Sequence, residues 1–204
     1  MLIAFESLYL GKEIDTNNAD PCSTLVSFLR DVVGLKGTKD NCAYGDTGAS
    51  NVIMSSWRPT QQKFLHRTIS ACSVLLGSCH RTNITTVEGI GTPALPHAVQ
   101  TRLVECHAIQ CGYDTPGIVV SMYGLLLNNS QPTMGEVEAA LVGNLSRDGY
   151  RAVLEAFKVF TEKPNLGELA KHEAKLPSAL KEEDSEPMVL RTGDLEWHRV
   201  PSHF

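Results

Sequence analysis

The chain has 204 residues and a formal net charge of −5, which allows one or two small domains, each large enough to bury a core. It has no concentrated Lys/Arg tract, so nothing indicates binding to nucleic acid or to an anionic membrane surface. No apolar run approaches the roughly 20 residues that a membrane-spanning helix requires. The composition therefore predicts an ordinary soluble protein without a nucleic-acid or membrane partner.

The first 88 residues have the pattern of mixed strand and helix. Strands are predicted, in chain order, at residues 2–10, 13–14, 51–57 and 85–87, the first two as a hairpin. Residues 23–33 predict an amphipathic helix that ends at Gly34, because their apolar side chains recur at helical spacing. This order of elements indicates a domain that combines a small sheet with a helix.

From residue 97 onward the pattern becomes helical. Helices are predicted at residues 97–107, 116–128, 134–142 and 150–160. Their brief connections are typical of a small bundle, and the last helix presents an apolar face for its core, made of Val153, Leu154, Phe157 and Phe160. After Lys163 the sequence becomes rich in Pro, Glu and Lys, which predicts an extended polar tail.

The amino-terminal segment gives an expectation of cellular location. The chain opens with Met1 and continues to Glu6 without a basic start, a long apolar core or a cleavage site, so a cytoplasmic location is expected. A secreted disulfide scaffold is accordingly not expected from the six cysteines. Cys22, Cys79 and Cys106 are interpreted as buried free thiols.

A loop at residues 37–50 has the form of one that wraps a two-iron cluster. Plant-type clusters take three thiolates from a C-x4-C-x2-C loop and one from a distant segment. Counted from Cys42, the next two positions fall on Thr47 and Ser50, and the distant position falls on Cys72. Two thiols and two hydroxyls therefore occupy this frame.

A second frame comprises residues 110–117, Gln-Cys-Gly-Tyr-Asp-Thr-Pro-Gly, and residues 143–151, Gly-Asn-Leu-Ser-Arg-Asp-Gly-Tyr-Arg. These segments resemble the Q-C-G-F-C-T-P-G and G-N-L-C-R-C-T-G-Y-R-P segments of the xanthine dehydrogenase and aldehyde oxidase family. Residues 24–30, 85–91 and 121–123 add to the resemblance. It covers nearly the whole chain and corresponds to the amino-terminal two-cluster [2Fe-2S] region of that family.

The resemblance implies an α+β fold in three parts. Residues 1–88 would form a plant-type ferredoxin-like β-grasp domain, residues 89–163 a helical bundle domain like the one that binds the second [2Fe-2S] cluster, and residues 164–204 a linker or tail. The tail resembles the lead-in to a flavin domain, so the chain looks like the front end of these enzymes without the catalytic remainder. In the family this region relays electrons from a molybdenum centre toward a flavin.

The resemblance also assigns the eight cluster positions residue by residue. The first cluster's positions are Cys42, Thr47, Ser50 and Cys72, and the second cluster's positions are Cys111, Asp114, Ser146 and Asp148. Family sites pair the first ligand with the second on one iron and the third with the fourth on the other. Thiolates suit these irons, whereas neutral hydroxyls bind iron weakly, so we expect no cofactor and no metal at either site.

Two other roles are open for the replaced positions. Asp114 precedes Pro116 and an apolar stretch, which favours a side-chain cap on the next helix, and Asp148 before Gly149 favours the same role. A mononuclear divalent metal held by Cys111, Asp114 and Asp148 is a further alternative, although structural zinc sites use four ligands that are mostly Cys or His. We expect residues 40–51 to be either mobile or hydrogen-bonded through Asp46, Thr47 and Ser50.

These observations lead to one main hypothesis and two alternatives. The main hypothesis is a cluster-free, non-catalytic relative of this family that acts as a binding or structural protein, with no catalytic residues and with another copy of itself or a full-length family enzyme as its partner. One alternative is an electron-transfer subunit that keeps one atypical [2Fe-2S] cluster through Cys42, Cys72 and oxygen ligands. The other is a small-ligand carrier that uses the space of the missing cluster.

Overall fold

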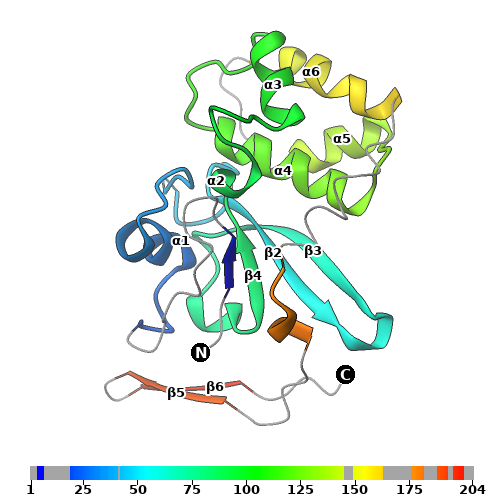
Figure 1. Ribbon diagram of the computed structural model, residues 1–204. Coiled ribbons are helices and arrows are strands. Elements are labelled where there is room, and N and C mark those ends of the chain that lie inside the picture. The colour runs from blue at the N-terminus through cyan, green and yellow to red at the C-terminus, as the bar shows by residue number, and fades with distance from the viewer. Residues whose placement is uncertain are drawn as a thin grey trace.

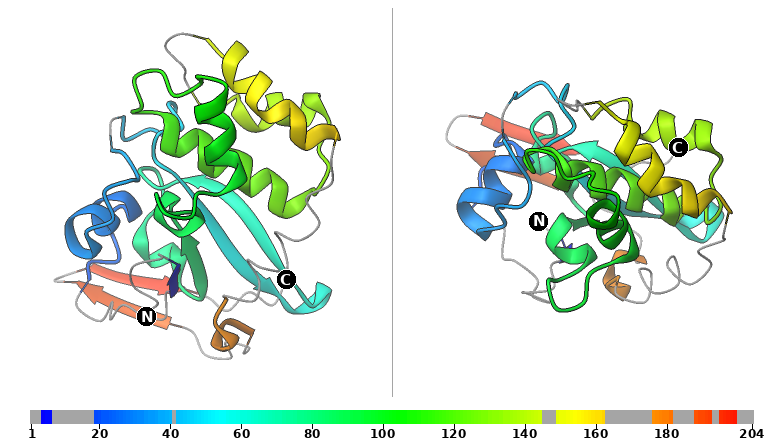
Figure 2. Two further views of the ribbon diagram at one scale, coloured as in Figure 1. Left: turned by 45° about the horizontal axis from the view of Figure 1, so that its top comes forward. Right: turned by 90° about the horizontal axis from the view of Figure 1, so that it is seen from above.

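The computed structural model describes residues 4–6, 19–40, 42–144, 149–162, 176–181, 188–192 and 195–199. A small sheet occupies one part of the molecule and a group of helices lies against one side of it (Figure 1). The views in Figure 2 show the same separation from two further directions. Within the described residues, no helix is both long enough and apolar enough to cross a membrane.

The main sheet has four strands in the order β1-β4-β2-β3. Its strands are β1 (Ala4–Glu6), β2 (Asn51–Arg58), β3 (Lys63–Ser70) and β4 (Thr82–Thr85). β1 runs parallel to β4, whereas the pairs β2–β3 and β2–β4 are antiparallel. The β2–β3 ladder begins at Asn51 opposite Ser70, so the turn that follows β3 lies beside the loop that precedes β2.

The strands of the main sheet agree only in part with those predicted from the sequence. The strand predicted at 51–57 is confirmed, and the one predicted at 85–87 is wrong in its bounds, because β4 ends at Thr85 and α2 (Val87–Ile90) follows. β3 was not predicted, because the polar residues at its start suggested a loop. The predicted hairpin lies mostly outside the described residues, and its described part, β1, pairs with β4.

The first helix packs against the main sheet. It begins as α1 (Leu25–Ser27) and continues as a wider, π-helical segment, η1 (Phe28–Val33). The hydroxyl of Thr24 accepts a hydrogen bond from the Ser27 backbone N–H, and Gly34 ends the helix with φ 83°. The predicted helix and its stop are therefore confirmed, and its apolar side packs with Val52, Leu76 and Ile84.

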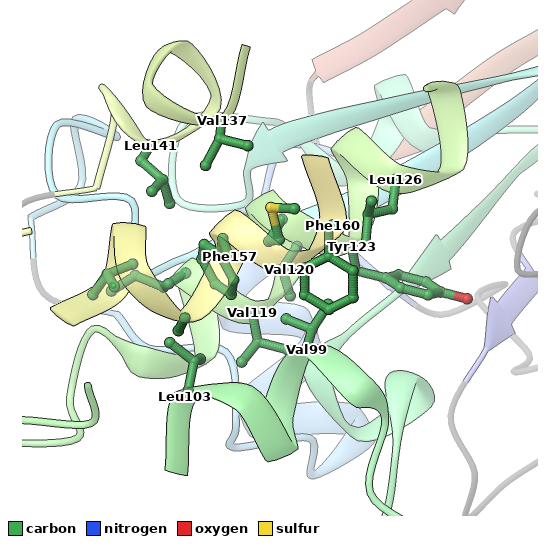
Figure 3. Close-up of a cluster of buried hydrophobic side chains, with 14 of the residues drawn as sticks. Val99, Leu103, Val119, Val120, Tyr123, Leu126, Val137, Leu141, Phe157 and Phe160 are labelled. Atoms are coloured by element: carbon green, nitrogen blue, oxygen red, sulfur yellow. The ribbon is translucent and has the colours of Figure 1, made fainter. Parts of the chain in front are cut away.

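The four predicted helices are also present: α3 (Ala98–Glu105), α4 (Thr115–Asn128), α5 (Met134–Leu141) and α6 (Arg151–Glu162). α4 is buried on nearly every side because it packs against the sheet and against the other helices. Figure 3 shows side chains of all four helices meeting in one core, among them Leu103, Tyr123, Val137 and Phe157. This packing places the first turn of α4 against the loop at residues 37–50.

The carboxy-terminal region is not wholly an extended tail, which corrects the sequence-based expectation. It contains the short helical turn η4 (Ser178–Lys181) and the antiparallel strands β5 (Met188–Thr192) and β6 (Leu195–Arg199). Leu176 and Leu180 are buried against Phe64 and Trp57 of the main sheet. Apolar residues within a polar segment thus hold η4 to the main sheet.

Candidate metal centre

The four positions of the first frame converge at one point. Cys42, Thr47 and Ser50 lie on the loop between η1 and β2, and Cys72 lies in the turn after β3. The Sγ atom of Cys42 is 3.6 Å from the Thr47 hydroxyl, and the Ser50 hydroxyl donates to the Cys72 sulfur over 3.1 Å. The two sulfur atoms are 4.0 Å apart. The structure therefore brings together all four residues that the sequence assigned to this site.

The pairing within this group follows the family's ligand order. The first and second positions, Cys42 and Thr47, form one contact, and the third and fourth positions, Ser50 and Cys72, form the other. Each pair supplies one sulfur and one oxygen.

The backbone of the loop is shaped to point its N–H groups at the sulfurs. Ala43, Gly45 and Gly48 have left-handed conformations, with φ 57°, 77° and 68°. This costs energy for Ala43, which has a Cβ atom. Backbone N–H groups of Tyr44 and Thr47 hydrogen-bond to Cys42, and that of Gly45 hydrogen-bonds to Cys72. Such a concave array of N–H groups is characteristic of anion and iron–sulfur sites.

The environment acts differently on the two thiols. For Cys42, burial acts to raise the pKa, but hydrogen bonds from the Thr47 hydroxyl and from backbone N–H groups outweigh it, so the pKa is lowered. For Cys72, which is 3% exposed, burial dominates and raises the pKa despite the hydrogen bond from Ser50. Cys42 is thus the thiol that ionises more readily.

A buried polar network fastens this loop to the helices. The Nδ2 groups of Asn51 and Asn144 each donate to the Ser121 hydroxyl over 2.9 Å. The Ser70 hydroxyl donates to Asn51 Oδ1 over 3.1 Å. Asn51 follows the ligand position Ser50, and Ser70 lies two residues before Cys72, so the network holds both sides of the site. The sequence analysis missed it, although a serine within the apolar stretch of α4 was a signal.

The prediction for residues 40–51 is confirmed in its hydrogen-bonded form at Thr47 and Ser50. The Thr47 hydroxyl contacts Cys42 and accepts from the Ala49 backbone N–H, and Ser50 bonds to Cys72. Tyr44 does not fold over the site, because its side chain is 86% exposed.

The second frame is described only in part. Cys111 is exposed, Asp114 is buried at the start of α4, and Ser146 and Asp148 lie outside the described residues. Asp114 precedes α4 without a side-chain cap, so the predicted capping role is wrong for this residue. The described residues contain no group of three or more His, Cys, Asp or Glu that could hold a metal ion. The mononuclear alternative with Asp148 stays a prediction.

The chain is similar in sequence to a known protein family. Residues 86–158 match a family model described as a [2Fe-2S] binding domain. The chain is 45% identical to mouse xanthine dehydrogenase/oxidase over 153 residues, which cover 74% of the chain and 12% of that protein. It is 47% identical to the xanthine dehydrogenase of Drosophila subobscura over 154 residues, with the same coverage of both proteins.

Solved structures agree with these sequence matches. Quinoline 2-oxidoreductase from Pseudomonas putida 86 superposes with a TM-score of 0.60 and 28% identity, covering 78% of this chain and 89% of that chain. Aldehyde oxidoreductase from Desulfovibrio gigas superposes with a TM-score of 0.66 and 26% identity, covering 89% of this chain and 18% of that chain.

The sheet, the helices and the converged ligand positions define an iron–sulfur-type domain. The chain belongs to the xanthine dehydrogenase and aldehyde oxidase family and corresponds to its [2Fe-2S] region. It spans about an eighth of the length of the curated relatives it matches.

The expectation of no cofactor is corrected by the family match, because residues 86–158 belong to a class described as binding a [2Fe-2S] cluster. That expectation was drawn from the ligand types at eight single positions. The match instead extends over nearly the whole helical part of the chain, which contains the second frame.

Proposed function

We propose that the chain is an electron-transfer domain that holds one atypical [2Fe-2S] cluster through Cys42, Thr47, Ser50 and Cys72. The observation that carries the proposal is the convergence of these four side chains in the order of the family's ligand pairs. When bound, such a cluster supplies reversible one-electron oxidation and reduction.

The donor set explains why the cluster would be atypical. Each iron would receive one thiolate and one hydroxyl oxygen, which would have to bind as its deprotonated alkoxide because a neutral hydroxyl binds iron weakly. The N–H groups of Tyr44, Gly45 and Thr47 compensate negative charge on the sulfurs. The buried side of the site, at Cys72, limits access of water. Hydrogen bonds to sulfur and solvent exposure both set the reduction potential of an iron–sulfur centre.

The organisation of the chain follows from the same proposal. Residues 1–88 form the ferredoxin-like β-grasp domain, residues 89–163 the four-helix domain, and residues 164–204 a linker of the kind that leads to a flavin domain. We place the protein in the cytoplasm. Because an electron-transfer domain needs a donor and an acceptor, its partner is a redox protein, such as a full-length enzyme of the family, or a second copy of the chain.

A chain of about this size occurs in quinoline 2-oxidoreductase, because the present chain covers 89% of the matched chain. The proposal assigns no chemical transformation of a substrate to the present chain, and its role is the passage of electrons between partners.

The test is a metal analysis of protein purified without oxygen. We expect about two irons and a similar amount of acid-labile sulfide per chain, with the visible absorption of a [2Fe-2S] centre. The variants Cys42→Ala and Cys72→Ala should each lose most of the iron. Cys22→Ala is the matched control, because Cys22 is exposed and lies outside both frames.

A further variant distinguishes the two frames. If Cys111→Ala removes the iron while Cys42→Ala keeps it, the cofactor is in the helical part and the proposed ligand set is wrong. Absence of iron and sulfide from the wild-type protein would refute the proposed function itself.

A further inference from the structure

We propose that Cys42 and Cys72 form a redox-active dithiol that exchanges with low-molecular-weight disulfides, such as glutathione disulfide, and closes into a reversible intramolecular disulfide. This is a thiol–disulfide site in addition to the proposed metal site. It concerns the protein without a cofactor and does not rest on the proposed function.

The distance between the two sulfurs carries the inference. They are 4.0 Å apart in the reduced protein, whereas a disulfide bond is about 2 Å long. The remaining movement is therefore about 2 Å, and no other side chain separates sulfurs that are already in contact. Cys42 and Cys72 are 30 positions apart in the sequence, so the fold, not local chain geometry, creates this pair.

Cys72 is held in place by its neighbours, whereas Cys42 lies on a loop that can move toward it. The neighbour of Cys72, Ala71, donates its backbone N–H to the Ser50 carbonyl and accepts from the Val26 N–H at its own carbonyl. Cys42 lies in a stretch of bends and turns next to Ala43, whose left-handed backbone is under strain. We therefore expect closure by movement of residues 42–47 toward Cys72.

Accessibility sets the order of the chemical steps. Cys42 is partly exposed, whereas Cys72 is 3% exposed, so the entering disulfide meets Cys42 first. The Cys42 thiolate attacks one sulfur of glutathione disulfide, and one glutathione thiolate leaves. The Cys72 thiolate then attacks the Cys42 sulfur and displaces the second glutathione. Two protein thiols are oxidised, one glutathione disulfide is reduced to two thiols, and the two protons pass to the leaving thiolates.

Cys42 and Cys72 cannot form a disulfide and bind a metal at the same time. A sulfur in a disulfide is no longer a thiolate donor, so oxidation of this pair would close the site to iron until the bond is reduced. The dithiol therefore makes loading of the metal centre dependent on the thiol redox state of the surroundings.

The experiment uses the full chain, freed of metal by a chelator and reduced, and then equilibrated without oxygen in glutathione buffers. After acid quenching and alkylation, peptide mapping measures which of the six cysteines are protected. We expect a linked peptide that contains Cys42 and Cys72 to accumulate as the share of glutathione disulfide rises. The exposed thiols Cys22 and Cys111 should form mixed disulfides only, and they serve as internal standards.

The dependence on glutathione concentration identifies an internal bond. Its formation releases two glutathiones for each glutathione disulfide consumed, so a tenfold dilution of the buffer at a fixed ratio raises the oxidised-to-reduced ratio of the pair about tenfold. The mixed disulfides at Cys22 and Cys111 should not change. In Cys72→Ala, the glutathione should remain attached to Cys42.

Other results would overturn the inference. A mixed disulfide at Cys42 that persists in the wild-type protein without a linked peptide would do so, as would a linked peptide that joins different cysteines. The same protein offers a second measurement, since the oxidised form should take up no iron until it is reduced. If the wild-type protein binds no iron in any state, the proposed function fails while the thiol measurements still decide this inference.

Discussion

Replacement of Gly117 by alanine tests whether the first turn of α4 holds the metal-site loop in place. A Cβ at this position would overlap the Gly48 carbonyl oxygen and lie 2.8 Å from its carbon, where ordinary contacts begin at 3.4 Å. The obstructing atoms are backbone, so the loop must move by more than half an ångström. Overpacking of this kind costs about 1–3 kcal/mol.

A matched variant removes the effect of helix propensity. Gly135 lies in the first turn of α5 with nothing within 4 Å of an added Cβ. Alanine in place of glycine favours a helix by about 1 kcal/mol at either position, so the difference between Gly117→Ala and Gly135→Ala isolates the clash. We expect Gly117→Ala to be less stable than Gly135→Ala by about 1–3 kcal/mol, at about 2–4 °C in Tm per kcal/mol.

Urea and thermal unfolding followed by circular dichroism measure this difference, and the iron content of each variant gives a second readout. Gly117→Ala should also lose iron, because Gly48 lies between the ligand positions Thr47 and Ser50. Equal stability and equal iron content of the two variants would refute the close approach of α4 to the loop.

Three further predictions concern stability. Hydrogen bonds from the backbone N–H and then the hydroxyl of Thr133 lower the pKa of Glu136. The contribution of the ionised carboxylate to the stability of the folded state is therefore complete above the ordinary pKa of 4.5 and is lost as the pH falls through the lowered pKa. Glu136→Gln should flatten the acid limb of a plot of Tm against pH, and an unchanged limb would contradict this. Phe157→Ala should cost about 3–5 kcal/mol in urea unfolding, because its fully buried ring lies in the helical core. The Nζ atom of Lys181 lies 5.2 Å from the ring centre of Trp57. Lys181→Ala should therefore weaken the attachment of η4 by about 0.5–1 kcal/mol and alter tryptophan fluorescence. Identical emission spectra would argue against this contact.

The predictions that held depend on short-range signals. Gly34 ends the first helix, and apolar spacing located four later helices, because both effects act within one or two turns of the chain. Spacing on one loop located Cys42, Thr47 and Ser50, and the resemblance to the family assigned the remaining ligand positions. The strand β3 escaped prediction because its stability comes from pairing with β2 and not from its own composition.

The three thiols outside the two ligand frames show that burial could not be predicted from the sequence alone. Cys79 is buried as expected, and burial raises its pKa to about 12, whereas Cys22 is exposed and Cys106 only partly buried. Apolar neighbours in the sequence do not determine whether a side chain points into the core. That depends on which other element covers it.

The sequence by itself determined the positions of the helices, the family and the residues that occupy the ligand frame. Only the tertiary structure decided how these residues act together. Cys72 meets Cys42 because β3 returns alongside β2, and the network of Asn51, Ser121 and Asn144 joins the loop to the helices. Spacing along a chain constrains neighbours within a few residues, whereas contacts between distant segments follow from packing of the whole core, which no local pattern encodes.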